Sequence, residues 1–213
     1  HSFAPALQQL SYQLSSSNFS NYSKDFENYF LMLKPFIDDE DFSNFIMIEL
    51  EDQAYDYQIN FNVSQRPYDF FIKFVNQKTF VGTMVINQRD FMVDGEMKID
   101  DESIDIKINA ASGDDFITIE YSSEVEKDEI ETEYQITQYI MGEFKEMTIE
   151  ISRESDEVSV EIIEGHKSFE LSKEIEDRVI YYLEYQINEV EGEGYILEEI
   201  IDGKIVYRYF IEE

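Results

Sequence analysis

The stretch YDYQINFNV at residues 55–63 places an apolar side chain at every second position, and KIVYRYFIE at residues 204–212 repeats this spacing at the far end of the chain. Successive side chains of a strand point to opposite faces, so the spacing gives each strand one apolar face and one polar face. The same alternation recurs from about Phe45 onward. It predicts a large antiparallel sheet with one dry face.

About fifteen strands are expected in this part of the chain. They lie near residues 45–51, 54–64, 69–76, 80–87, 90–94, 96–100, 103–109, 115–122, 130–140, 144–152, 157–164, 167–171, 179–191, 194–201 and 204–212. Asp94-Gly95 and Asp202-Gly203 are typical of two-residue hairpin turns, and residues 112–115 and 192–194 of looser ones. Short turns join neighbouring antiparallel strands, so the predicted topology is a meander. The segment Lys173–Tyr182 fits either a short helix or strands.

Apart from the segment Lys173–Tyr182, helical spacing is confined to the N-terminal part. Residues 3–16 predict a short amphipathic helix, and a second apolar stripe runs from Tyr22 to Ile37, with Pro35 near its end. The predicted fold is therefore α+β and β-dominated, with N-terminal helices packed on a large twisted antiparallel β-meander that is half-barrel or barrel-like. We expect a single domain over residues 1–213, with a helical segment at 1–40 and the meander at 42–213.

The charge of the chain is strongly negative. Its 16 basic and 48 acidic residues give a formal net charge of −32, yet 15 Tyr and 17 Phe supply enough apolar surface for a folded core. Such a surface repels nucleic-acid phosphates and anionic lipid headgroups, so we expect no direct binding to either. Basic proteins and cations are the expected partners of this charge.

Localisation is read from the ends and from cysteine usage. No run of residues approaches the length of a transmembrane helix. The start at His1-Ser2 and the absence of Cys favour an exported bacterial protein, secreted or lipid-anchored, whose leader has been removed. A trimmed cytoplasmic protein would look the same, so both readings stay open.

Enzymatic signatures are absent from the sequence. His1 and His166 are the only histidines, and His166 follows Gly165 in a predicted hairpin turn. The nucleophile elbow, the Gly-rich phosphate loop and the dinucleotide-binding fingerprint do not occur. Nothing in the sequence pairs two carboxylates for glycoside hydrolysis. We therefore expect a non-enzymatic protein without a cofactor.

Two acidic clusters are candidate cation sites, because Ca²⁺ prefers several oxygen ligands from one loop. The clusters are Asp38, Asp39, Glu40 and Asp41, and Asp114 with Asp115. Neither has the ligand spacing of a calcium-binding helix–loop–helix. Solvated surface acids are the competing reading.

The apolar face is wider than two helices can cover. The sheet could close, split into two layers or leave a cavity for an apolar ligand or lipid. The residues predicted to line such a concave face lie in the middle of strands: Phe61, Ile72, Phe74, Ile106 and Ile119. The same residues fit an ordinary filled core. The predicted function is binding of an apolar ligand or a protein partner through the concave face.

The polar faces of the strands carry many like charges. Their glutamates are Glu120, Glu126, Glu129, Glu131, Glu133, Glu150, Glu161, Glu170 and Glu184. Repulsion across strands costs stability but discourages aggregation at sheet edges. The alternative function is accordingly an acidic interaction or scaffold protein with a filled core, including imitation of nucleic-acid charge, or a cation-binding surface protein.

Overall fold

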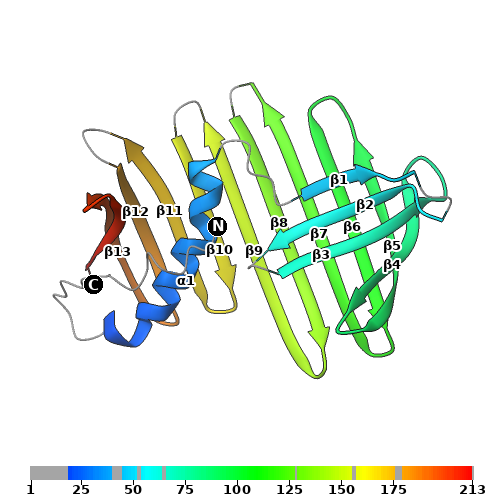
Figure 1. Cartoon of the computed structure of the whole chain (residues 1–213), viewed down its shortest axis with the longest axis horizontal. Coiled ribbons are helices and arrows are strands. Elements are labelled where there is room, and N and C mark those ends of the chain that lie inside the picture. The colour runs from blue at the N-terminus through cyan, green and yellow to red at the C-terminus, as the bar shows by residue number, and fades with distance from the viewer. Residues whose placement is uncertain are drawn as a thin grey trace.

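A computed structural model of the chain describes residues 19–39, 45–51, 54–63, 66–127, 129–154, 157–175 and 179–212. These residues form one helix, α1 (Phe19–Asp38), and fourteen strands (Figure 1). The strands are β1 (Phe45–Glu49), β2 (Tyr57–Val63), β3 (Arg66–Phe74), β4 (Thr79–Ile86), β5 (Arg89–Ile99), β6 (Ser103–Ser112), β7 (Asp115–Glu126), β8 (Glu129–Ile140), β9 (Glu143–Glu154), β10 (Glu157–Glu164), β11 (Lys167–Ile175), β12 (Val179–Ile187), β13 (Val190–Ile201) and β14 (Lys204–Glu212).

The strands form one antiparallel sheet in sequence order from β1 to β14, which confirms the predicted meander. Within the described residues, β1 and β14 each pair with a single neighbour, so the sheet is open and the closed, barrel-like form of the prediction is wrong. The physical reason is that α1 and the curled first strands cover the apolar face themselves.

Several hairpins use the turns that their residues favour. Both central residues have positive φ at Met141-Gly142 (54° and 84°) and at Asp202-Gly203 (52° and 75°), as a two-residue turn of this hand requires. The predicted turn at Asp202-Gly203 is therefore confirmed. The predicted connection at residues 112–115 is also present, with Gly113 at a φ of 65°.

Three other glycines, Gly95, Gly192 and Gly194, were predicted to mark turns and lie inside strands instead. Asp94-Gly95 lies inside β5, so the predicted strands at 90–94 and 96–100 are one strand. A Cβ on Gly95 would lie 2.3 Å from Cζ of Phe80 and 2.4 Å from the carbonyl oxygen of Lys107. Gly194 lies inside β13, where a Cβ would meet the carbonyl oxygen of Phe210 at 2.4 Å. Gly95 and Gly194 allow close packing within the sheet, which is a different reason for glycine in a strand.

The second predicted helix is confirmed as α1, which continues past Pro35 to Asp38. The first predicted helix, at residues 3–16, lies outside the described residues. The segment 173–182 is strand wherever it is described, in β11 and β12.

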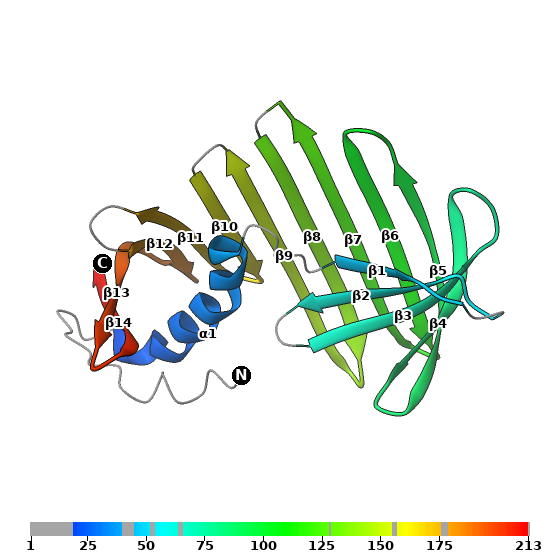
Figure 2. The same cartoon turned by 45° about the horizontal axis from the view of Figure 1, so that its top comes forward.

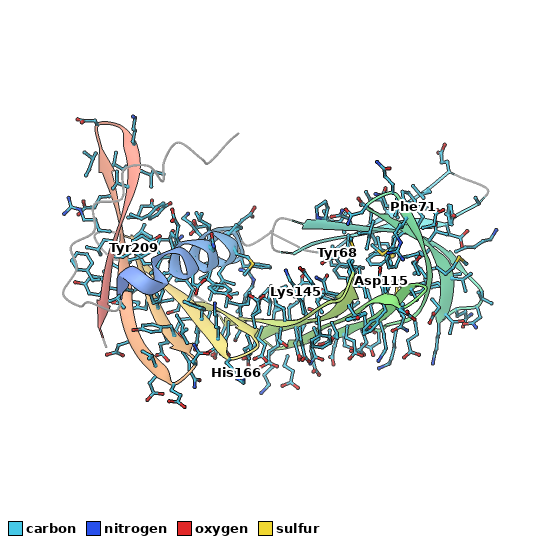
Figure 3. All side chains as sticks on the ribbon, turned by 90° about the horizontal axis from the view of Figure 1, so that it is seen from below. Tyr68, Phe71, Asp115, Lys145, His166 and Tyr209 are labelled. Atoms are coloured by element: carbon cyan, nitrogen blue, oxygen red, sulfur yellow. The ribbon has the colours of Figure 1, made fainter. Side chains whose placement is uncertain are left out.

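The sheet curls toward one side at both of its ends (Figures 2 and 3). At one end β1–β3 cross over β6–β8, and at the other β11–β14 curve around α1. We call β1–β8 the N-terminal lobe, α1 with β10–β14 the C-terminal lobe, and the side of β5–β13 that faces away from α1 the outer face. Strand β9 joins the two lobes.

Each lobe buries aromatic side chains against its own strands. In the C-terminal lobe, Phe30 makes edge-to-face contacts with Tyr181 and Tyr207, with ring centroids 5.2 and 5.0 Å apart. In the N-terminal lobe, Phe61 lies against Phe70 and Tyr121 in similar geometry. Burial of these rings stabilises the fold, because each removes a large apolar area from water.

Candidate functional site

The residues predicted to line a ligand-binding concave face lie in the core of the N-terminal lobe. Phe61, Ile72, Ile106 and Ile119 are exposed by 3% or less. Phe74 is partly buried and contacts the ring of Phe80 at a centroid distance of 5.8 Å. The structure therefore brings the five residues together as packed core side chains. A ligand would contact four of them only if the lobe opened.

Two residues of the first acidic cluster, Asp38 and Asp39, lie among the described residues. Asp38 ends α1 and accepts hydrogen bonds from Lys173 Nζ at 2.7 Å and from the Tyr181 hydroxyl at 2.9 Å, and it pairs with Lys34. Burial alone would raise the pKa of Asp38, but the hydrogen bonds from Lys173, Lys34 and Tyr181 outweigh it and lower the pKa. Asp39 follows the helix, and Glu40 and Asp41 lie outside the described residues. Asp38 thus holds α1 against the sheet.

A second contact secures the same end of the helix. The Arg153 guanidinium on β9 donates to the carbonyl oxygen of Phe36 in the last turn of α1. Carbonyls in the last turn of a helix have no partner within the helix, so a cation from the sheet satisfies one of them. The helix is therefore fixed to both β9 and β11.

The second acidic cluster, Asp114 with Asp115, belongs to the β6–β7 hairpin. Asp114 is exposed in the turn, whereas Asp115 is buried, pairs with Arg89 and accepts the backbone N–H of Met141 at 3.0 Å. The pKa of Asp115 is lowered by the Met141 N–H and by Arg89. Its carboxylate links three hairpins. Among the described residues, no three His, Asp or Glu side chains converge to hold a metal ion.

A row of six glutamates crosses the outer face. Glu133, Glu150, Glu161, Glu170, Glu184 and Glu193 occupy directly opposed positions on the adjacent strands β8 to β13. Because neighbouring strands lie about 4.8 Å apart, the row spans about 24 Å. We call these six residues the glutamate row.

The packing of each strand fixes the direction of these side chains. Glu161, for example, lies between Val160 and Ile162, which are both fully buried in the core. Alternation along the strand then places Glu161 on the outer face. Figure 3 shows this face, below the central strands, crowded with side chains.

The glutamate row is electrostatically strained. The pKa of Glu161 is raised by burial and by the charges of Glu150, Glu170 and Glu184. The pKa of Glu170 is raised by burial and by Glu184. The middle of the row therefore holds its negative charge less readily than isolated glutamates would. A cationic group placed there would relieve this repulsion.

The row also runs through two shallow depressions. One, of about 600 Å³, has Glu133, Glu150, Glu161 and Glu170 in its lining. The next, of about 460 Å³, is lined by Glu161, Glu170, Glu184 and Glu193. They share Glu161 and Glu170, so the acidic surface is continuous and slightly concave.

Sequence reasoning named five of these six glutamates and their mutual repulsion, but it did not align them. The sequence does contain a signal for this alignment, because two residues equally far from a two-residue turn lie opposite each other. Glu161 and Glu170 are equally far from the Gly165-His166 turn, and Glu133 and Glu150 from the Met141-Gly142 turn. Glu193 was not named because residues 192–194 were predicted to be a turn. The turn lies instead at Asn188-Glu189.

Comparisons of the chain with protein-family models, with curated proteins and with solved structures give no match. The described part of the chain contains no helix with the length and apolar character that a membrane crossing requires.

Proposed function

We propose that this protein is a non-enzymatic scaffold that binds a basic protein partner through the glutamate row. The observation that carries the proposal is the in-register alignment of six glutamates on six consecutive strands. Scattered surface acids would be enough for solubility. A continuous row adds like-charge repulsion that scattered acids avoid, and a cationic partner would convert this cost into binding free energy.

The shape of the row indicates the kind of partner. Carboxylates spread along a line of about 24 Å match several Lys or Arg side chains on a protein surface better than they match one ion. The row runs across the strands and lies in depressions that admit long side chains. A basic partner would associate quickly, and the association would weaken as salt is added.

The test uses dodecalysine as the probe. In Glu161→Gln/Glu170→Gln/Glu184→Gln, we expect the dissociation constant to rise about tenfold at low salt, with a shallower dependence on salt concentration. Glu49→Gln/Glu51→Gln/Glu102→Gln changes the net charge by the same amount at exposed positions outside the row and serves as the control. Equal weakening in the two triple variants would show that only net charge matters, and would reject the proposal.

A second candidate function is binding of a small apolar molecule on the concave side of the sheet. A depression of about 730 Å³ lies at the mouth of the N-terminal lobe, and its lining includes Met84, Ile86 and Ile140. The bond from the Tyr68 hydroxyl to Oε1 of Gln138, at 2.9 Å, crosses from β3 to β8 in its wall. We would test this candidate with Nile red, whose fluorescence should rise with the wild type and fall in Ile140→Gln but not in Val75→Gln.

A further inference from the structure

A second row on the outer face is apolar. Met92, Ala111, Phe116, Tyr139 and Phe144 occupy directly opposed positions on the adjacent strands β5 to β9. We call these five residues the apolar row. It lies on the same face as the glutamate row, toward the β6–β7 and β8–β9 turns.

The side chains of the apolar row are open to solvent. Met92 is 70% exposed, Phe144 60% and Phe116 38%. The rings of Phe116 and Tyr139 are stacked, with centroids 6.2 Å apart. Single exposed apolar residues are ordinary on protein surfaces, but an uninterrupted row on five neighbouring strands is a contiguous patch of the kind that marks interaction sites.

Four acidic residues lie along the border of the apolar row. Asp90 and Asp94 lie on either side of Met92 along β5, Asp114 lies in the turn beside Phe116, and Glu146 follows Phe144 on β9. All four are exposed. This border complements a partner that carries basic groups around an apolar patch. It opposes a second copy of this chain, whose own net charge is −32, and it opposes an anionic membrane.

The two rows share strands β8 and β9. Tyr139 is six residues from Glu133 on β8, and Phe144 is six residues from Glu150 on β9. Six residues of strand span about 20 Å, and the even separation keeps both rows on one face. A partner covering about 800 Å² of surface, the usual size of one side of a stable interface, reaches both rows.

We propose that the apolar row is the anchor of the interface with the basic protein partner, with Phe116 and Phe144 as its principal contacts. Exposed charges mainly accelerate and orient association, whereas aromatic side chains that become buried slow dissociation. The glutamate row therefore steers the partner, and the apolar row holds it. This inference rests on the proposed function, and each row is tested by a different kinetic constant.

The experiment measures association and dissociation rates with two extended peptides, one of alternating Lys and Phe and one of alternating Lys and Asn. In Phe116→Thr/Phe144→Thr, we expect the dissociation rate of the Lys-Phe peptide to rise about tenfold, because buried aromatic contacts dominate interface affinity. The association rate should stay unchanged, and so should both rates for the Lys-Asn peptide. Threonine keeps strand propensity, and thermal unfolding checks that the double variant is folded.

Val75→Thr/Ile200→Thr is the matched control, since both residues are exposed and lie outside the row. An unchanged dissociation rate for the Lys-Phe peptide in the folded Phe116→Thr/Phe144→Thr variant would overturn the anchor. Two further outcomes would also overturn it: a wild-type dimer in sedimentation that the variant loses, or wild-type binding to phosphatidylcholine vesicles that the variant loses. The glutamate-row variants are expected to change the association rate, whereas the apolar-row variant is expected to change the dissociation rate. The proposed function and the anchor can therefore be rejected independently.

Discussion

Arg89 at the start of β5 pairs with Asp115 at the start of β7, 26 residues further along the chain. Arg89 also donates through Nη2 to the carbonyl oxygen of Ser112 at 3.0 Å, and Asp115 accepts the N–H of Met141 at 3.0 Å. The β4–β5, β6–β7 and β8–β9 hairpins are thereby joined at one end of the sheet. The apolar row lies directly beside this junction.

The first prediction concerns this junction. Asp115→Ala should lower the melting temperature by a few degrees, because it leaves the Met141 N–H without its carboxylate partner and separates Arg89 from β7. Since the folded pKa of Asp115 is lowered, its contribution is present above the unfolded pKa near 4 and is lost as pH falls through the folded value. Asp114→Ala, one residue away in the exposed turn, is the control. Melting curves from neutral to acid pH should converge for wild type and Asp115→Ala only at the acid end.

The second prediction concerns Gly95. Gly95→Ala should destabilise the protein by about 1–3 kcal/mol or more, because the new methyl group overlaps the Phe80 ring and the Lys107 carbonyl. Gly113→Asn is the comparison, since Gly113 has positive φ, a Cβ there meets no atom within 4 Å, and Asn tolerates this conformation. Urea unfolding gives both values. A Gly95 variant as stable as the Gly113 variant would contradict the close approach.

The sequence predicted those features of the fold that follow from the alternation of apolar and polar residues alone. The period of two predicted the strands and their antiparallel order, since a meander needs only short turns between neighbours. The turns themselves were harder, because Gly95 and Gly194 resemble turn glycines yet serve close packing between strands. The curvature of the sheet could not be predicted from the sequence pattern. Whether its ends meet depends on how α1 and β1–β3 share the apolar face, which local periodicity does not encode.

The third prediction concerns the anchoring of α1. Asp38→Asn should reduce the free energy of unfolding by about 1–3 kcal/mol, because the ammonium groups of Lys173 and Lys34 would then donate to an uncharged amide oxygen and lose their ion pairs with the carboxylate. The folded pKa of Asp38 is lowered, so this stabilisation is present above the unfolded pKa and disappears as pH falls. Glu174→Gln on β11 controls for the change of charge. Urea titrations at neutral and acid pH should show a large difference between Asp38→Asn and wild type at neutral pH alone.

The candidate site was only partly accessible to sequence reasoning. The abundance of glutamates and the cost of their repulsion follow from composition, but their alignment follows from register, and register requires each turn to be placed to the residue. One misplaced turn, at residues 192–194, removed Glu193 from the row. The apolar row also depends on register. Tyr139 on β8 lies opposite Phe116 on one side and Phe144 on the other, and this alignment is known only once both turns are placed.

The fourth prediction separates repulsion in the glutamate row from its use in binding. Glu161→Gln/Glu170→Gln should raise the free energy of unfolding at neutral pH by about 0.5 kcal/mol, a small value because these carboxylates are half-exposed and screened by solvent. The folded pKa values of both residues are raised. For such groups, the native contribution is most favourable below the unfolded pKa, where they are protonated, and is lost as pH rises through the folded pKa.

The gain in the glutamine variant should therefore vanish in acid and shrink when salt is added at neutral pH. Glu49→Gln/Glu51→Gln, at exposed positions outside the row, should gain less stability at neutral pH. The same Glu161→Gln/Glu170→Gln protein should bind dodecalysine more weakly although it is more stable. A variant that gained stability without losing affinity would mean that the row is a tolerated cost of the acidic surface and has no part in recognition.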